Sequence, residues 1–299
     1  MPVPPPSALR SEPATPAELL EVFSWLDRDP IVNVYLAALV LRDRLAAPAD
    51  EYWLVRRGGE LSGLVHLGTL SGAVLPVGGG ADVHAVLAER VAERLDRLPP
   101  RFQVVGDRGG VEAIVARLRT AGIEPRRYRP HTYMAVAQGG LPDFERVGAL
   151  RPARPEDYPL VHDSGADLRA EEIGDDPRAS DPDGYARRVG EECHGGYTYL
   201  WIEDGELRFR ASLSALTADA VQIAGVYTPP AWRGRGYARR GLAELCARQF
   251  ARVRAACLFV SDANAPALAV YRRLGFLPCA AWGSALYARP PAPGGGLSP

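Results

Sequence analysis

A short apolar strand that runs into a loop of glycines and arginines, and then into an amphipathic helix, constrains this chain most. The strand ends at residues 226–228, and the loop and the first helical turn occupy residues 233–238. The first N–H groups of a helix have no partner within it, and the helix dipole adds partial positive charge there. Glycine lets the backbone approach an anion, and arginine adds charge-assisted donors. The junction therefore predicts a pyrophosphate site.

The residues that this loop lacks narrow the kind of cofactor. The chain has 35 arginines and no lysine. A P-loop, which needs a lysine, is therefore excluded. A dinucleotide-binding fingerprint needs three spaced glycines, whereas Arg233 and Ala238 stand at the first and third of those positions. The cofactor is therefore expected to be of another nucleotide-like kind.

The loop and a segment downstream of it together resemble one family. The Arg-x-x-Gly-x-Ala arrangement at Arg233, Gly236 and Ala238 resembles the acyl-CoA loop of the GNAT superfamily of N-acetyltransferases. After one helix and one strand, that family's Asn-x-x-Ala-x-x-x-Tyr-x-x-x-Gly-Phe segment is matched by Asn264, Ala267, Tyr271, Gly275 and Phe276. The resemblance covers residues 148–288 and is sharpest over residues 221–276.

This resemblance implies an acyltransferase that uses acetyl-CoA (coenzyme A) as co-substrate and needs no metal. The amides of the 226–228 strand would pair with the pantetheine arm, and one would face the thioester oxygen. Asn264 would contact the same arm, and Tyr271 would protonate the departing thiolate, because a phenol stays protonated at neutral pH. The implied cofactor-binding residues are Val226, Tyr227, Thr228, Arg233, Gly234, Arg235, Gly236, Tyr237, Ala238 and Asn264.

The residue that removes a proton from the attacking amine is left open by the sequence. Many members of the family place a glutamate on the third strand of the unit, but Gln222 stands in that region and cannot accept a proton usefully. The expected catalytic bases are Glu171 and Glu172, in an acidic stretch where the family forms its acceptor wall. His194 and a chain of waters are alternatives. Cys193 has no evident His/Asp partner for acyl-enzyme chemistry.

The order of elements repeats, which predicts an α/β (α+β, mixed-sheet) chain of tandem acyl-CoA N-acyltransferase (GNAT) folds. Residues 1–140 are expected to form a degenerate GNAT-like domain, since Gly78-Gly79-Gly80 carries no arginine and no Asn…Tyr pair follows. Residues 147–289 are expected to form the catalytic domain, and residues 290–299 a disordered tail. Expected helices are 16–26, 31–45, 82–98, 111–121, one opened by 153–157, 182–191, 237–253 and 266–274. Expected strands are 52–57, 61–67, 70–77, 102–105, 132–136, one near 150, 197–202, 207–213, 221–228, 258–260 and 276–287.

The sequence also predicts two helix caps and the exposed face of one helix. Asp82 and Asp181 are expected to cap the helices that follow them. The helix over 237–253 is expected to bury its apolar stripe and to leave Arg239, Arg240, Glu244 and Arg248 mostly on the opposite face.

Composition limits the partners of the chain. The net charge of −1 opposes a nucleic-acid or polybasic membrane surface, and hence aminoacyl transfer from tRNA. The N-terminus lacks a signal-peptide pattern and no apolar run reaches membrane-spanning length, so a cytoplasmic protein is expected. The expected partner is a small-molecule or peptide amine, with the chain a monomer or homodimer. The alternative function is a non-catalytic acyl-CoA-binding regulatory module.

Overall fold

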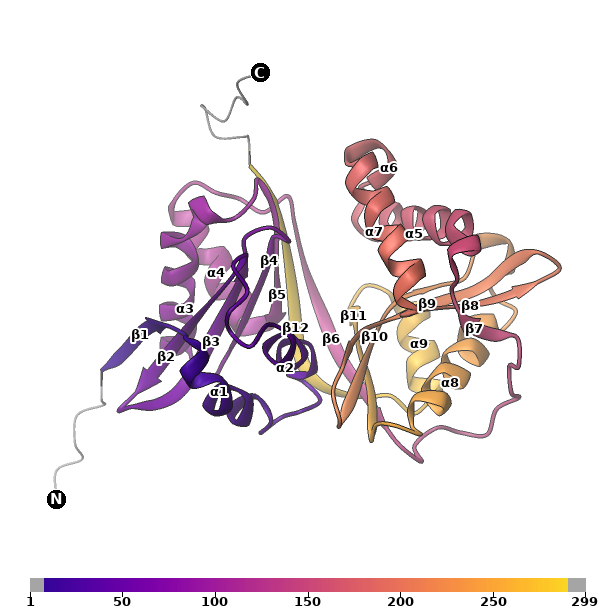
Figure 1. The fold of residues 1–299 in the computed structure, drawn as a ribbon, viewed down its shortest axis with the longest axis horizontal. Helices are drawn as coiled ribbons and strands as arrows, with labels where there is room; N and C mark the ends of the chain where they lie inside the picture. The colour runs from indigo at the N-terminus through magenta and orange to yellow at the C-terminus, as the bar shows by residue number, and fades with distance from the viewer. Residues whose placement is uncertain (1–7, 290–299) are drawn as a thin grey trace. The chain divides into compact units, whose positions relative to one another are not determined.

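A computed structural model describes residues 8–289, which form two compact units (Figure 1). The first unit contains residues 8–133 and 280–289, and the second contains residues 134–279. Each unit is a mixed sheet with helices on both faces, as the alternation of strand and helix patterns predicts. The expected tail at residues 290–299 lies outside the described residues.

The first unit builds its sheet in the order β1-β2-β3-β4-β5-β12-β6. Its strands are β1 (Leu9–Pro13), β2 (Asp50–Arg57), β3 (Glu60–Gly68), β4 (Ala73–Gly78), β5 (Arg101–Asp107), β6 (Arg127–Ala137) and β12 (Leu277–Ala288). Its helices are η1 (Pro16–Glu18), α1 (Leu19–Leu26), α2 (Val34–Asp43), α3 (Ala81–Glu93), η2 (Leu95–Arg97) and α4 (Arg108–Thr120). The pair β4/β5 is parallel, whereas β1/β2, β2/β3, β3/β4 and β5/β12 are antiparallel.

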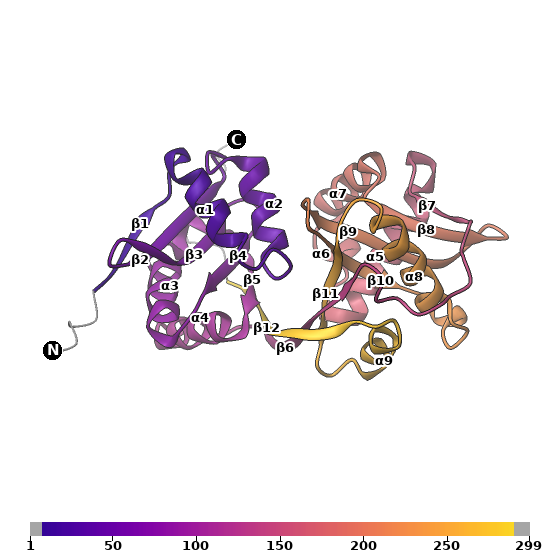
Figure 2. The ribbon, with the colours of Figure 1, turned by 90° about the horizontal axis from the view of Figure 1, so that it is seen from below.

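Two apolar clusters fill the two faces of this sheet. Helices α1 and α2 bury Val22, Leu26 and Leu36 against one face, whereas α3 and α4, which lie side by side, cover the other (Figure 2). Alternate residues of β2 point into different clusters, Leu54 with α1 and α2 and Val55 with α3 and α4. The two-residue period of a strand thus serves both faces.

The second unit has the strand order β6-β11-β10-β9-β8-β7. Besides β6 it contains the strands β7 (Leu150–Pro152), β8 (Thr198–Glu203), β9 (Glu206–Leu216), β10 (Ala220–Tyr227) and β11 (Ala255–Ser261). Its helices are η3 (Pro155–Asp157), α5 (Tyr158–Ile173), α6 (Pro177–Ser180), α7 (Pro182–Gly195), η4 (Pro230–Trp232), α8 (Tyr237–Gln249) and α9 (Ala265–Arg273). Helices α8 and α9 pack on one face of the sheet, and α5 and α7 on the other.

The last strand of the chain completes the sheet of the first unit, although it was expected to close the second half of the sequence. Residues 282–288 of β12 pair antiparallel with residues 101–107 of β5. The ring of Tyr287 stacks on Phe102 with centroids 4.6 Å apart, inside the core of the first unit. A strand pattern fixes which face is apolar but not which strand lies beside it. The domain ranges 1–140 and 147–289 stay a prediction.

Several local expectations differ from the structure. Gly80, with φ +90°, is the N-cap of α3 instead of Asp82, whose carboxylate lies in the first turn and pairs with Arg57. Asp181 does cap α7, because its Oδ1 accepts the N–H of Gly184 at 3.2 Å. The strand expected from residue 70 begins only at Ala73, after a turn, and β1 and α6 were not predicted.

Glu244 is buried rather than on the exposed face of α8, with only 1% of its surface exposed. The segment before β7 covers it: the Arg146 guanidinium donates to both carboxylate oxygens at 2.7 and 3.0 Å, and the Val147 N–H donates at 3.1 Å. Arg248, one turn along the helix, donates at 2.7 Å. These donors, the Arg146 guanidinium first, lower the pKa of Glu244 to about 2. The expectation for this residue was wrong because helical spacing cannot show what covers a polar face.

Glu244→Gln is expected to destabilise the protein at neutral pH and to have about half that effect at pH 3. Because the folded-state pKa lies below the unfolded one of about 4.3, the carboxylate stabilises the fold fully above that value and progressively less as pH falls toward 2. The loss at pH 7 should be about 3 kcal/mol. Urea unfolding of both proteins at pH 7 and pH 3 measures it. Glu145→Gln, at an exposed pair with Arg240, is the control and should cost under about 1 kcal/mol. An equal loss at both pH values would contradict the assignment.

Candidate functional site

The strands β10 and β11 separate at the end that leads to the glycine–arginine loop. They pair in parallel at Ala220–Gln222 with Ala255–Cys257. Beyond Gln222, no described residue of β11 pairs with β10. The edge of residues 223–227 that faces β11 therefore presents backbone groups outside the sheet ladder, where an extended ligand could pair with them.

A β-bulge changes the direction of the backbone at the same place. Ala224 is opposite Ser212 and Tyr227 is opposite Arg210, so β10 has one more residue than β9 in this interval. Gly225 takes φ +61° in the bulge, a conformation that glycine adopts without strain. Bulges of this kind redirect groups next to binding sites. After it, Tyr227 and Thr228 are buried and Val226 is half-buried.

The N-terminus of α8 is open, as expected for an anion site. Gly234 and Gly236 have φ +74° and +84°, and Gly236 is the N-cap. Among residues 8–289 no side chain caps the helix, and the Arg240 N–H bonds the Gly236 carbonyl at 3.0 Å to close its first turn. A Cβ on either glycine would meet no atom of the described part of the chain within 4 Å. The amides of Tyr237 and Ala238 thus begin a helix beside open space, which fits a pyrophosphate.

The two arginines of the loop are held differently. The Nε of Arg233 donates to the Thr228 carbonyl at 2.9 Å, and its Nη2 contacts both carboxylate oxygens of Glu171 at 2.8 Å. Arg233 therefore links the loop to the end of β10 and to α5. The guanidinium of Arg235 lies 4.7 Å from the centre of the Trp232 ring and is exposed. Arg235 remains at the surface, where it can meet a phosphate.

Asn264 and Tyr271 lie on the last helix of the unit, α9. The Oδ1 of Asn264 accepts the Ala267 N–H at 3.2 Å and so caps this helix. Tyr271 is 7% exposed, and its ring centroid lies 5.9 Å from that of Phe276. Burial, and next the negative charge of Glu172, raise the pKa of the Tyr271 phenol above its usual value. The phenol is therefore protonated at neutral pH.

The other candidate residues lie at the end of α5, in β10 and on α7. Glu171 and Glu172 occupy the last turn of α5, the first paired with Arg233 and the second near Tyr271. Gln222 is buried, and its Oε1 accepts the Ser214 hydroxyl at 3.0 Å. His194 is exposed near the end of α7, and burial raises the pKa of the Cys193 thiol, which opposes a thiolate nucleophile. Glu171 is thus in contact with the named site residue Arg233, and the charge of Glu172 acts on Tyr271, whereas His194 bonds the Gly190 carbonyl of its own helix.

Sequence reasoning missed a polar network beneath the β10 bulge. The Glu192 carboxylate of α7 accepts from Arg210 Nη2 at 2.7 Å, from Ser212 Oγ at 3.2 Å and from the Thr198 hydroxyl. Ser212 Oγ lies 3.6 Å from the position that a Cβ on Gly225 would take. The signal that could have revealed it is the alternation of polar side chains at Arg210, Ser212 and Ser214 in β9, where a core strand should be apolar on both faces.

Part of the chain matches a known protein family. Residues 166–276 match the acetyltransferase (GNAT) family, and they include the bulge, the loop, α8 and Tyr271. No curated protein sequence matches the chain. The resemblance to the GNAT superfamily inferred from the motifs is confirmed, because this match spans both halves of the motif.

Solved structures show the same fold at low sequence identity. A GCN5-related N-acetyltransferase from Sphaerobacter thermophilus has 19% identity and a TM-score of 0.59, covering 94% of this chain and 96% of that one. A GNAT-family acetyltransferase from Colwellia psychrerythraea has 10% identity and a TM-score of 0.56, covering 94% and 99%. A tandem GNAT protein from the clavulanic acid biosynthesis pathway has 20% identity and a TM-score of 0.51, covering 95% and 99%. The predicted tandem GNAT fold is confirmed.

Two further observations concern residues 8–289. No helix in this range is long and apolar enough to cross a lipid bilayer. No group of three His, Cys, Asp or Glu side chains in it has a geometry that could hold a metal ion.

Proposed function

We propose that this chain, whose residues 166–276 belong to the acetyltransferase (GNAT) family, transfers an acetyl group from acetyl-CoA to an amine of a small molecule or peptide. The observation that carries the proposal is the uncapped N-terminus of α8 beside the separated edge of β10. The first suits a pyrophosphate and the second suits an extended, amide-bearing arm. One ligand class, an acyl-CoA, joins a pyrophosphate to an amide-bearing pantetheine arm in a single molecule.

Each site residue receives a role in this proposal. Residues 234–238 would hold the pyrophosphate, and the amides of residues 226–228 would hold the pantetheine arm and polarise the acyl carbonyl. An acyl thioester supplies the acyl group and a thiolate leaving group. Tyr271 would give its phenolic proton to that sulfur, and its burial supports the role by keeping the proton in place. Asn264 would keep the start of α9 in position.

For the general base we favour Glu172 over Glu171. Arg233 contacts both carboxylate oxygens of Glu171, which holds that group in the loop, whereas the charge of Glu172 acts on Tyr271. Glu172→Gln is therefore expected to lower kcat by about 10²-fold and to flatten the acidic limb of the pH–rate profile. Glu171→Gln should chiefly raise the KM for acetyl-CoA. Steady-state kinetics of both variants show which glutamate is the base. A larger kcat loss in Glu171→Gln would reverse the assignment.

Release of coenzyme A in the presence of amines tests the function itself. A thiol-reactive dye would report coenzyme A formed from acetyl-CoA with a panel of primary amines, diamines, aminoglycosides and N-terminal peptides. We expect amine-dependent release by the wild type and none by Gly236→Pro. Tight acetyl-CoA binding without release for any amine would instead support the alternative, a non-catalytic acyl-CoA-binding regulatory module.

One coenzyme A per chain is expected, because the first unit lacks the features of the second at the corresponding place. In β4, Pro76 has no N–H to offer a ligand, and its ring lies 3.1 Å from where a Cβ on Gly106 of β5 would be. Asp82 places a carboxylate in the first turn of α3, which repels phosphate. Calorimetric titration with acetyl-CoA should give a stoichiometry of one. Two equivalent sites would show that the first unit also binds the cofactor.

A further inference from the structure

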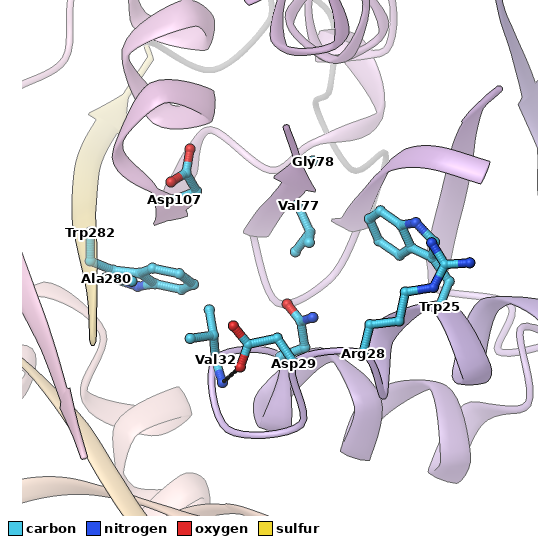
Figure 3. Close-up of a pocket in the computed structure, with 10 residues that line it drawn as sticks. Trp25, Arg28, Asp29, Val32, Val77, Gly78, Asp107, Ala280 and Trp282 are labelled. Carbon is cyan, nitrogen blue, oxygen red and sulfur yellow. Dashed lines mark hydrogen bonds between the residues drawn. The ribbon is translucent and has the colours of Figure 1, made fainter. Parts of the chain in front are cut away.

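The first unit contains a cavity of about 380 Å³ that the proposed acyl transfer does not use (Figure 3). Its walls come from the connection between α1 and α2, the ends of β4 and β5, and the start of β12. Every lining residue belongs to the first unit, so the cavity is distinct from the site at β10 and α8. Its volume lies within the range of pockets that hold small molecules.

Two indole rings form much of the apolar wall. Trp282 of β12 is 8% exposed, and its ring packs against Tyr133 with centroids 4.9 Å apart, which fixes its orientation. Figure 3 shows Trp282 and Trp25 at opposite sides of the view, with Val32 and Val77 between them. Tryptophan faces attract cations as well as apolar groups. The Nε1 of Trp282 is buried and has no hydrogen-bond partner among the described residues.

Two carboxylates line the same cavity, and local hydrogen bonds orient both of them. Asp29 Oδ1 accepts the Val32 N–H at 3.2 Å, and Asp107 Oδ1 accepts the Gly110 N–H at 3.1 Å. Asp107 Oδ1 also lies 3.4 Å from the Nε2 of His84. Arg28 is the cation of the lining, so the formal charge of the wall is one positive against two negative. The excess of carboxylates and the indole faces both favour a cationic ligand.

We propose that this cavity binds a small organic ammonium ion with an apolar body. The negative charges of Asp29 and Asp107 would attract the ammonium group, and Trp25, Trp282, Val32 and Val77 would enclose the body. Binding requires neither acetyl-CoA nor turnover, because the lining shares no residue with the site in the second unit. The inference therefore holds whether or not the chain transfers acetyl groups.

Calorimetry without acetyl-CoA, with three probes of one shape and different charge, tests the proposal. The probes are 2-phenylethylamine, its neutral N-acetyl derivative and the anion 3-phenylpropionate. We expect the amine to bind at least about tenfold more tightly than the other two. No measurable binding of the amine up to about 10 mM, or equal binding of the neutral probe, would overturn the proposal. Preferential binding of the anion would overturn it too, by assigning the site to Arg28.

Variants locate the binding to this cavity. Asp29→Asn with Asp107→Asn removes both charges but keeps an oxygen for the Val32 and Gly110 amides, and should weaken amine binding about tenfold. Val32→Trp fills the cavity without a charge change and should also weaken it. Asp27→Asn, which is exposed and outside the lining, and Gly236→Pro are controls that should bind normally. Undiminished amine binding in both test variants, or loss of amine binding in Gly236→Pro, would contradict the proposal.

Discussion

Replacing Gly236 with proline is expected to weaken acetyl-CoA binding by at least about 100-fold, because two or more charge-assisted bonds to phosphate are lost. Gly236 has φ +84°, and the proline ring fixes φ near −65°, so the loop cannot keep its path into α8. The substitution also removes one backbone N–H. Titration calorimetry with acetyl-CoA measures the loss, and thermal unfolding shows whether the fold persists.

Gly139 provides a matched control for this variant. It lies in the same unit and has φ +85°, and, as at Gly236, no described atom lies within 4 Å of the position of a Cβ. Gly139→Pro should therefore cost similar stability but leave acetyl-CoA binding intact. Gly236→Ala keeps the N–H in a strained conformation and should fall between wild type and proline. Unchanged affinity in a folded Gly236→Pro protein would place the pyrophosphate elsewhere.

Tyr271→Phe should lower kcat by about 10²-fold and leave acetyl-CoA affinity nearly unchanged. The substitution keeps the ring that packs near Phe276 in the core of the second unit but removes the phenolic proton. Burial holds the pKa of this phenol above its usual value, so the acid form is available across the neutral range. Steady-state kinetics with a reactive amine, together with calorimetry for acetyl-CoA, separate the two effects.

The variant Tyr271→Ala distinguishes chemistry from packing. If the ring only packs, Tyr271→Phe should turn over at nearly the wild-type rate, while Tyr271→Ala should unfold at lower denaturant because a buried aromatic ring is lost. If Tyr271 is the acid, both variants should be slow and only the alanine variant unstable. A fully active phenylalanine variant would leave water or another residue to protonate the thiolate.

Local features of the site were predictable because they depend on residues close in sequence. The strand, loop and helix at residues 226–238 follow from apolar spacing and from glycines that take positive φ at Gly234 and Gly236. The capping position of Asn264 and the proline at the start of α9 follow from helix-end preferences. The family match to residues 166–276 includes all of these positions.

Features that depend on distant residues were not predictable in this way. Glu244 belongs to a polar helical face, and only the path of Arg146 and Val147 shows that the face is covered. Glu192 lies on a helix whose pattern gives no sign that Arg210 and Ser212 meet it from β9. The alternation in β12 gives its faces but not its neighbour β5. In each case the missing information is which segment lies opposite.

The position of β12 has a consequence for folding of the protein during its synthesis on the ribosome. The sheet of the first unit needs residues 280–288 between β5 and β6, yet these residues are synthesised only after the whole of the second unit. The N-terminal half therefore cannot reach its final state while the second unit is emerging, although domains usually mature in the order of their synthesis. Until then β5 presents an unpaired edge, which is a point of vulnerability to misassembly. A nascent chain stopped before residue 277 should remain protease-sensitive in its first unit, even though more than 250 of its residues have already been made.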